Sequence, residues 1–581
     1  MFHKSLLAQQ GEKECAKLHS VVNKLVVVAA LSTGLLVCLT LFMKPDLSEQ
    51  FLQPHFSVNL PGVPPLPRSQ PHLDWASQLH CNVIGNPKWA GRAVQPQRTR
   101  EAHYFEEADY HYMDKPGLGD LVHVRVDVYD GRGRPLSRGG DEVRVLLQEP
   151  EKKASLATEV TDLGNGSYYA AVPLLWTGSP LVKASLVYNR ELIRAHHYAR
   201  SAVKSIKNIA AGFKSFFASE ATLCSPFPFL PGYSRFCNFT EENGGMPWYC
   251  GHPRNEALTC RHWWRSFDLE FVYPLPVTAA EEAWSTYVAS RKPTARVPTE
   301  IKVKVTDSAK PSPQRHTTSP PVGKAANLQS WTSQAPRGYF LQNSWVSSSS
   351  TIPKFTKPQL LQCLKNTTVL FLGDSNARLA FKILAERVGC SLNTGEVKPS
   401  WHHPLSCEDN QNNIYMYWQI HALPFHAGKK SGCDRGDSKS AKQYIDEIPA
   451  EGKYLLMIHL NLHFPAHHYS VFTSQMHQVR ASVERVLRRN PEVKVVVRGP
   501  HQALKGWVPL NGGDITAHVL TNIIKRLFEG LTDRVFFLQP WDMTVAIQNG
   551  PFHPSNLVNN AISDLFLAYA CYSSEGGRKL L

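Results

Sequence analysis

The 581-residue sequence lacks the common signatures of nucleic-acid binding and of metal binding. It contains no RNA-recognition motif, zinc finger or helix–turn–helix pattern, so a nucleic-acid partner does not explain the formal charge of +15. No carboxylate stands at ligand spacing from the histidine pairs His402-His403 and His467-His468, which argues against a metal site. The charge then reflects either an ordinary basic surface or a preference for acidic ligands.

Charge is also absent from the stretch Leu25–Met43. At about 19 residues and a 1.5 Å rise per residue, this stretch is roughly long enough to cross a bilayer. Lysines precede it, so the positive-inside rule places residues 1–24 in the cytosol and the rest in the lumen. No small-x-small cleavage site follows Met43, which favours an uncleaved signal anchor over a signal peptide. The sequence predicts a single-pass type II membrane protein of the Golgi or ER lumen, with a secreted protein as the alternative.

Glycosylation motifs and cysteines agree with a lumenal location. Asn165, Asn238 and Asn366 each begin an Asn-x-Ser/Thr acceptor motif. Of the 12 cysteines, two (Cys15 and Cys38) lie in or before the apolar stretch, which leaves ten, five in each half. An oxidising lumen would pair these ten as disulfides. Five in each half implies either one bridge between the halves or a free thiol in each.

Composition divides the first part of the chain into three segments. Residues 44–72 form a Pro-rich stem, which is an extended and semi-rigid spacer. Residues 73–275 contain short strands with alternating apolar residues and turn signals, which predict a β-sandwich. Residues 276–340 are rich in Pro, Ser, Thr and Lys and predict a linker. The sandwich ends in a cysteine cluster whose spacing fits no common zinc site, so we expect a disulfide-stapled module around Cys224, Cys237, Cys250 and Cys260.

The second half, residues 341–575, has an alternation of strands and helices. The apolar run Thr368–Leu372 predicts a buried strand, and a helical pattern follows over Ala377–Val388. Similar pairs recur as far as Tyr569. This alternation predicts a parallel sheet with helices on both faces. Reactive side chains of such a sheet lie beyond the carboxyl ends of its strands.

Gly373-Asp374-Ser375 stands at the end of the first of these strands. The glycine permits a tight exit from the strand, and the serine comes to the beginning of a helix. Free backbone N–H groups at a helix N-terminus can stabilise an oxyanion, so Ser375 is a candidate nucleophile. The alternative is structural, because Asp374 or Ser375 could simply cap the helix.

A nucleophilic serine needs a base, which is normally a histidine oriented by an acid. His553 follows the last predicted strand and is the candidate base, and Asp542 directly after that strand is the candidate acid. The order Ser, Asp, His is that of α/β-sheet hydrolases. The structural alternatives are a loop histidine and a turn-forming aspartate. A second pair, Asp514 and His518, opens a helix before the last strand and is not assigned to the site.

The next predicted strand along the chain also ends in polar residues. Asn461 follows Tyr454–Leu460, and its amide is a candidate donor to the oxyanion. His463 lies two residues further on and is a candidate substrate-binding residue, with a buried or loop histidine as the structural alternative.

These residues together resemble the PC-esterase branch of the SGNH/GDSL hydrolases. In that family the Gly-Asp-Ser serine is the nucleophile, which corresponds to Ser375, and an Asn after a middle strand supports the oxyanion, as Asn461 would. The last block contains an Asp and a His, which correspond to Asp542 and His553. Two features differ: the family usually separates that Asp and His by two residues instead of ten, and the Gly and Asp that flank its Asn are missing around Asn461.

The first half resembles a neurexophilin-type domain, from His72-Leu-Asp-Trp75 to the cysteine-rich run that ends in Cys260-Arg-His-Trp-Trp264. That family consists of secreted or tethered Ig/filamin-like modules with a Cys-rich tail. With both halves in this order, residues 73–575 resemble the neurexophilin and PC-esterase domain family. The predicted fold class is therefore multidomain: a signal anchor, an Ig/filamin-like β-sandwich with a Cys-rich tail, then an SGNH-like three-layer α/β domain with a parallel sheet.

The resemblance implies serine-dependent acyl transfer on glycans through an acyl-enzyme, by a sugar O-acetyltransferase or O-acetyl esterase. It implies no bound cofactor, and an acyl donor such as acetyl-CoA would be a co-substrate. The expected partner is a glycan or glycoprotein, with acidic glycans suited to the basic chain. The alternative is a catalytically inactive binding or signalling protein whose neurexophilin-like domain binds a cell-surface receptor. A lumenal lipase has less support, because the sequence shows no amphipathic lid.

Overall fold

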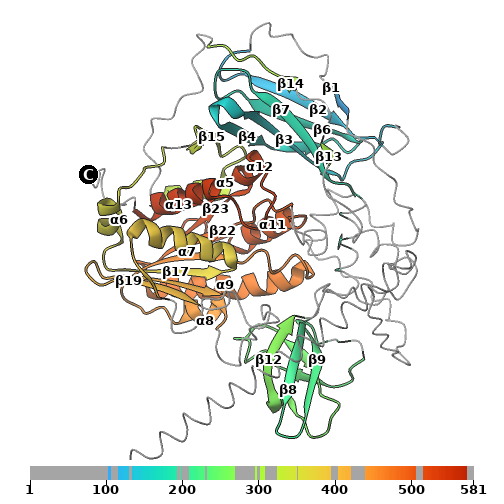
Figure 1. Cartoon of the computed structure of the whole chain (residues 1–581), viewed down its shortest axis with the longest axis vertical. Coiled ribbons are helices and arrows are strands. Elements are labelled where there is room, and N and C mark those ends of the chain that lie inside the picture. The colour runs from blue at the N-terminus through green and yellow to red at the C-terminus, as the bar shows by residue number, and fades with distance from the viewer. Residues whose placement is uncertain are drawn as a thin grey trace, which may run out of the picture. The chain divides into compact units, whose positions relative to one another are not determined.

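A computed structural model of the chain gives the architecture of most of its length (Figure 1). All described residues belong to one compact unit, Arg68–Leu581. The predicted cytosolic segment (1–24), signal anchor (25–43) and stem (44–72) lie outside the described residues. The structure describes residues 103–105, 116–129, 134–190, 193, 196–197, 200, 209–228, 230, 232–268, 295–296, 301–307, 323–349, 351–393, 404–420, 439–504 and 514–571.

A seven-stranded sheet forms the centre of the C-terminal half. Five of its strands are parallel neighbours, and two further strands extend one edge in antiparallel fashion. The central strands are apolar at most positions because both of their faces are covered. In spatial order the strands are β18 (Leu392–Asn393), β19 (Leu405–Asp409), β20 (Ile414–Ile420), β17 (Thr367–Gly373), β21 (Lys453–His459), β22 (Lys494–Arg498) and β23 (Val535–Leu538).

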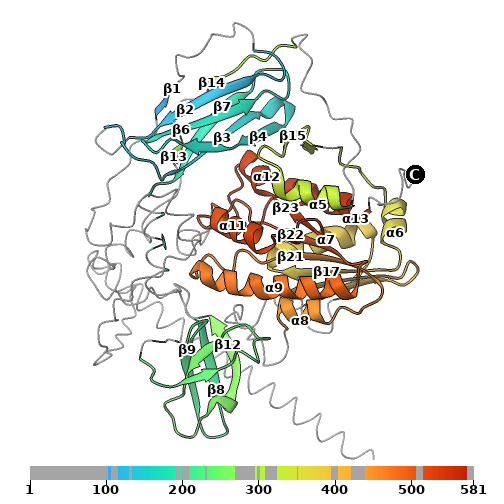
Figure 2. The same ribbon diagram turned by 180° about the vertical axis from the view of Figure 1, so that it is seen from behind.

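Helices cover both faces of this sheet, as Figures 1 and 2 show for α7 and α13 on one side and α8 and α9 on the other. The first face packs α6 (Lys357–Leu364), α7 (Ser375–Val388), α12 (Trp541–Ala546) and α13 (Asn556–Cys571) against one buried apolar cluster. The second face packs α5 (Gly323–Thr332), α8 (Ala441–Asp446), α9 (Tyr469–Arg489) and α11 (Ala517–Leu527) against another. The amphipathic pattern of α7, α9 and α11 predicts this placement.

Two antiparallel sheets form the β-rich part of the first half, and their inward-facing residues share one core. The alternating valines Val122, Val124 and Val126 belong to this core, as their period of two predicts. The smaller sheet is β1 (His103–Phe105), β2 (Leu121–Asp127), β6 (Ser167–Pro173) and β5 (Val160–Asp162). The larger is β13 (Ala295–Arg296), β7 (Leu181–Tyr188), β3 (Glu142–Glu149), β4 (Ala154–Thr158), β15 (Gly338–Leu341) and β16 (Ser344–Ser347), with β14 (Ile301–Lys302) on β7.

A separate five-stranded sheet carries the cysteine cluster. Its order is β10 (Phe236–Asn238), β11 (Tyr249–Gly251), β9 (Ser219–Ser225), β8 (Ile209–Lys214) and β12 (Trp263–Asp268). The short 3-10 turns η1 (Pro150–Lys152) and η2 (Cys260–His262) complete the first half. The predicted disulfides are confirmed: the cysteine cluster forms Cys224–Cys250 and Cys237–Cys260, and the C-terminal half forms Cys363–Cys571 and Cys390–Cys407.

The predicted fold class requires a correction. It began with a signal anchor, yet no helix in the described part of the chain combines the length and the apolar character needed to span a bilayer. Hydropathy reports composition, whereas a span also needs a continuous helix. Strands β13–β16, which lie within residues 295–347, complete the larger sheet of the sandwich, so part of the predicted linker and the beginning of the predicted second domain contribute strands to it. These strands have two to four residues each, too few for a recognisable period.

Candidate active site

The turn from β17 to α7 brings Ser375 to the carboxyl edge of the parallel sheet. Gly373 ends the strand with φ +155°, and a Cβ atom there would lie 2.2 Å from the carbonyl oxygen of His459. Asp374 is the N-cap of the helix, and its Oδ1 accepts a hydrogen bond from the Asn376 N–H at 2.8 Å. The cap is therefore supplied by Asp374, and the Ser375 hydroxyl makes a different contact.

That contact is with His553. The Nε2 atom of His553 lies 2.7 Å from the Oγ atom of Ser375, although the two residues are 178 positions apart. His553 is exposed and lies between α12 and α13, while Ser375 is half-buried at the first position of α7. A helix leaves the N–H groups of its first turn without partners inside the helix. In α7 the N–H groups of Asn376, Ala377 and Arg378 donate to Asp374, which leaves the Ser375 N–H as the candidate backbone donor. The structure therefore combines a serine–histidine pair with a helix N-terminus, an arrangement that suits an activated nucleophile.

Asp542 is bound to a different residue. It is buried at the beginning of α12, where its Oδ2 accepts the Arg337 backbone N–H at 2.8 Å. Its Oδ1 is 3.2 Å from the Arg337 guanidinium. The interval between Asp542 and His553 contains most of α12, instead of the short loop typical of an acid–base pair. The structure thus brings the serine and the histidine of the predicted triad into contact. The predicted acid instead links α12 to Arg337, in the segment before β15.

A buried charge lies behind the serine. Burial alone would raise the pKa of Asp374, but His459, His463 and two backbone N–H groups together hold it well below its usual range. One of these N–H groups belongs to Leu462, whose backbone nitrogen lies 3.0 Å from Asp374 Oδ2. Burial and the charge of Arg498 lower the pKa of His459 to about 4 against the opposing effect of Asp374. At neutral pH an ionised Asp374 and a neutral His459 therefore fix the beginning of α7.

The predicted oxyanion residue Asn461 lies at the same edge of the sheet. β21 pairs with β17 so that His459 is opposite Gly373, and Asn461 follows His459 by two residues. Asn461 is buried, and its carbonyl accepts the Phe464 N–H at 3.0 Å in a tight turn. His463 lies within this turn and acts electrostatically on Asp374. Both predicted residues thus lie in the turn after β21, the strand that pairs with β17.

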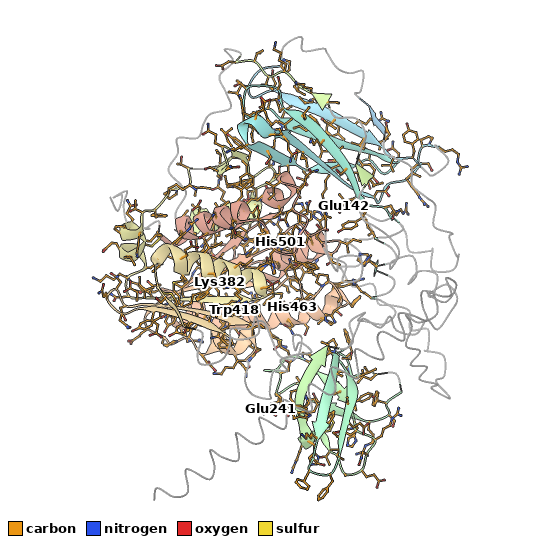
Figure 3. The ribbon with its side chains drawn as sticks, viewed as in Figure 1. Glu142, Glu241, Lys382, Trp418, His463 and His501 are labelled. Carbon is orange, nitrogen blue, oxygen red and sulfur yellow. A yellow bond between two sulfur atoms is a disulfide. The ribbon has the colours of Figure 1, made fainter. Side chains whose placement is uncertain are left out.

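Positive charge accompanies Ser375 along α7. Arg378 and Lys382 follow the serine at positions i+3 and i+7, which share one helix face. The Arg378 guanidinium lies over the ring of Trp418 at 5.4 Å, and Figure 3 labels Lys382 and Trp418. Within the described residues neither cation has an ion-pair partner. Burial lowers the pKa of both groups, and the charge of Arg378 lowers that of Lys382 further.

Sequence reasoning missed two residues at the end of β22. Arg498 ends the strand and donates to the Asn376 carbonyl at 3.2 Å, and His501 lies 2.8 Å from the Phe552 carbonyl. Both are buried. Arg498 is the last residue of β22 and His501 follows it, at the edge of the sheet that carries Ser375. The sequence signal that could have identified them is their position at the carboxyl end of a predicted strand, where the reactive residues of a parallel sheet lie.

Two cavities in the described part of the chain do not include Ser375. A cavity of about 650 Å³ is lined by Glu142, Arg144, His518 and Trp541, and one of about 220 Å³ by Trp345 and Tyr569, and Ser375 lines neither. The part of the chain that the structure describes contains no group of three or more His, Cys, Asp or Glu side chains able to hold a metal ion.

The three predicted glycosylation sites are accessible. Asn165, Asn238 and Asn366 are all exposed in the structure. Asn165 lies in the turn between β5 and β6, Asn238 on β10, and Asn366 directly before β17.

The C-terminal half is thus an α/β domain with a mostly parallel sheet, and it carries a serine at a strand-to-helix turn in contact with a histidine before the last helix. Residues 345–571 match the family model described as NXPE family member 4-like, C-terminal domain. This family is related to the PC-esterases, in agreement with the resemblance found in the C-terminal half. The match contains β17, α7, Ser375 and His553, whereas the neurexophilin-type resemblance lies outside the matched residues.

Proposed function

We propose that the chain is a serine-dependent acyltransferase or acyl esterase acting on glycans, with Ser375 as nucleophile and His553 as base. The observation that carries the proposal is the 2.7 Å contact between His553 Nε2 and Ser375 Oγ. A contact of this length is within hydrogen-bond reach and permits proton transfer. The location of Ser375 at a helix N-terminus on a mostly parallel sheet supports the same assignment.

The reaction has two steps. Ser375 Oγ attacks the acyl carbon of the donor while His553 Nε2 takes the serine proton. The bond to the leaving group then breaks, and His553 returns that proton to it, which leaves an acyl-serine. A sugar hydroxyl, or water in an esterase, then attacks the acyl-serine and gives its proton to His553. The bond between the acyl carbon and Ser375 Oγ breaks, His553 returns the proton to Oγ, and the ester or acid departs. The Ser375 N–H at the beginning of α7 and the Asn461 amide stabilise the oxyanion in both steps.

The substrate class follows from the charge beside the serine. Arg378 and Lys382 extend from Ser375 along one face of α7 without a carboxylate partner among the described residues. Such a face favours an anionic group, as in acidic glycans and glycoproteins. An acyl donor with phosphates, such as acetyl-CoA, fits the same charge and is a co-substrate instead of a bound cofactor. We place the reaction in the Golgi or ER lumen, or after secretion, because the residues that the structure describes include four disulfides.

One observation favours a second candidate, a binding protein without catalysis. Asp542 pairs with Arg337, so the carboxylate that the resemblance assigns to His553 is used elsewhere. In this case the β-rich first half would bind a cell-surface receptor, and the serine–histidine pair would be a remnant.

Acetyl-ester hydrolysis and acetyl transfer separate the two candidates. The acyltransferase proposal predicts that the purified wild-type chain hydrolyses an activated acetyl ester, that Ser375→Ala abolishes this activity, and that Ser219→Ala does not. Ser219 is an exposed serine of the cysteine-rich sheet and serves as the matched control. With sialylated and neutral acceptors, Arg378→Gln should reduce transfer to the sialylated glycan more than to the neutral one. Wild-type activity equal to that of Ser375→Ala would refute the enzyme and leave the binding protein.

A further inference from the structure

Hydrogen bonds to two carbonyl groups, those of Phe552 and Pro551, anchor the loop directly before His553. His501 Nε2 lies 2.8 Å from the carbonyl oxygen of Phe552, the residue directly before His553. Burial and the charge of Arg498 lower the pKa of His501 to about 3, so its ring is neutral at pH 7. Because a carbonyl only accepts, the single ring proton resides on Nε2 and is donated to Phe552.

Asn549 and Gln502 hold the other side of the loop. The Asn549 amide donates to the Pro551 carbonyl at 2.8 Å and to the Gln502 carbonyl at 2.7 Å. In return, the Gln502 amide donates to the Asn549 carbonyl at 2.8 Å. Both residues are buried. These reciprocal bonds and the His501 contact fix the backbone from residue 549 to residue 552.

Gln502 is itself held by a residue of the β-sandwich. Its Oε1 accepts from Arg144 Nη1 at 2.7 Å, and Arg144 lies on β3 of the larger sandwich sheet. The same guanidinium is 3.1 Å from Asp514 and 2.9 Å from Glu142, and it stacks on Trp541 at 4.7 Å. Arg144 is only 6% exposed. Figure 3 labels Glu142 on the strand of Arg144, and His501 beyond β22.

The electrostatic surroundings keep Arg144 charged and Glu142 ionised. Burial would lower the pKa of Arg144, but Asp514 and Glu142 raise it above its usual value. Burial would raise the pKa of Glu142, but Arg144 and His518 lower it to about 2. Arg144 therefore remains charged, and can donate to Gln502, throughout the physiological pH range.

We infer that Arg144 is a positioning residue for the base. Through Gln502 and Asn549 it fixes the loop of His553 against Ser375, so the β-sandwich is part of the acyl-transfer site. The inference rests on the proposed function. It assigns to hydrogen bonds from the sandwich the orienting role that Asp542 does not fill. Displacement of a catalytic group by about 1 Å is enough to cost roughly 100-fold in rate.

Gln502→Glu breaks this link selectively. The carboxylate still accepts from Arg144, whose charge Asp514 and Glu142 already balance, but in its ionised form it cannot donate to the Asn549 carbonyl. Gln148→Glu is the matched control, because Gln148 on β3 donates across the same contact, to the Ala546 carbonyl at 3.0 Å, without touching the His553 loop. Arg144→Lys keeps the charge and supplies a single point donor, and serves as the conservative variant.

The readouts are the rate at which a fluorophosphonate labels Ser375, measured against pH, and hydrogen–deuterium exchange of residues 549–553. The inference predicts that Gln502→Glu labels at least about 10-fold more slowly at every pH and exchanges faster at 549–553. Gln148→Glu should match wild type, and Arg144→Lys should fall between them. Labelling and exchange of Gln502→Glu at wild-type rates would overturn the inference. If wild type itself does not label, the proposed function fails, and the exchange of Gln502→Glu against Gln148→Glu still decides whether Arg144 holds the loop.

Discussion

Replacement of Gly373 by alanine tests how closely the strand before the serine is packed. The added Cβ atom would lie 2.2 Å from the His459 carbonyl oxygen and 3.1 Å from the Ala377 side chain. The carbonyl belongs to the paired strand β21 and the alanine to α7, so neither atom can rotate away. Relief of the contact requires β17 to separate from β21 or α7 to shift, and either change moves Ser375 away from His553.

The cost combines overpacking and backbone strain. Overpacking in a close-packed interior costs about 1–3 kcal/mol, and a backbone conformation that side chains rarely adopt costs roughly 1–3 kcal/mol more. The total of about 2–6 kcal/mol corresponds to a fall of roughly 5–20 °C in the midpoint of thermal unfolding for a domain of this size. Gly530→Ala is the matched control: Gly530 has φ +82°, but nothing lies within 4 Å of its Cβ position. It should cost only the backbone term, about 1–2 kcal/mol.

Thermal unfolding by circular dichroism and acetyl-ester hydrolysis provide the two readouts for this pair. Gly373→Ala should unfold at a clearly lower temperature than Gly530→Ala and should lose most of its hydrolytic rate below its own unfolding midpoint. Equal midpoints for the two variants, or full activity of folded Gly373→Ala, would refute the packing assigned to the β17–α7 turn.

Three further predictions follow from the surroundings of the site. Asp542→Asn should destabilise the fold by about 1–3 kcal/mol in chemical denaturation and change the rate of Ser375 labelling by less than about 10-fold. Loss of an acid that orients the histidine of a triad costs about 10⁴-fold in rate. A loss of that size in Asp542→Asn would show that Asp542 belongs to the site. The pKa values of His459 and His501 are about 4 and about 3 in the folded chain, against 6.5 for an exposed histidine. The free energy of unfolding should therefore be fully retained above pH 6.5 and fall as the pH drops towards 4, because only the unfolded state takes up protons there. A variant His459→Asn should flatten this curve, and an unchanged slope would contradict it. Replacement of the disulfide pair Cys363 and Cys571, 208 residues apart, by serine should lower stability by about 3–5 kcal/mol, and loss of less than about 1 kcal/mol in urea unfolding would contradict the pairing.

The elements nearest the serine could be predicted from the sequence because their signals are local. The predicted strand Thr368–Leu372 lies within β17, and the predicted helix Ala377–Val388 lies within α7. A continuous apolar run that ends in glycine marks a buried parallel strand, and an apolar stripe marks the helix that covers it. Ser375 and His553 could be paired because both lie beyond the carboxyl ends of strands of one sheet.

The partners of Asp542 and Gln502 could not be predicted, because they come from distant strands. Arg337 precedes β15, which has four residues and pairs with β4 of the sandwich, and Arg144 lies on β3, 358 positions before Gln502. Neither arginine stands in a local pattern that distinguishes it from other basic residues of the chain. The choice of partner depends on how the sandwich packs on the α/β domain, which periodicity does not report.

Active-site labelling tests the serine–histidine pair most directly. The purified wild-type chain, Ser375→Ala and His553→Gln are treated with a fluorophosphonate, and the modified peptide is identified by mass spectrometry. Because His553 removes the serine proton, the account predicts a single label on Ser375, none on Ser375→Ala, and a labelling rate for folded His553→Gln that is about 10²–10⁴-fold lower. No label on the folded wild-type chain, or equal rates for wild type and His553→Gln, would contradict it.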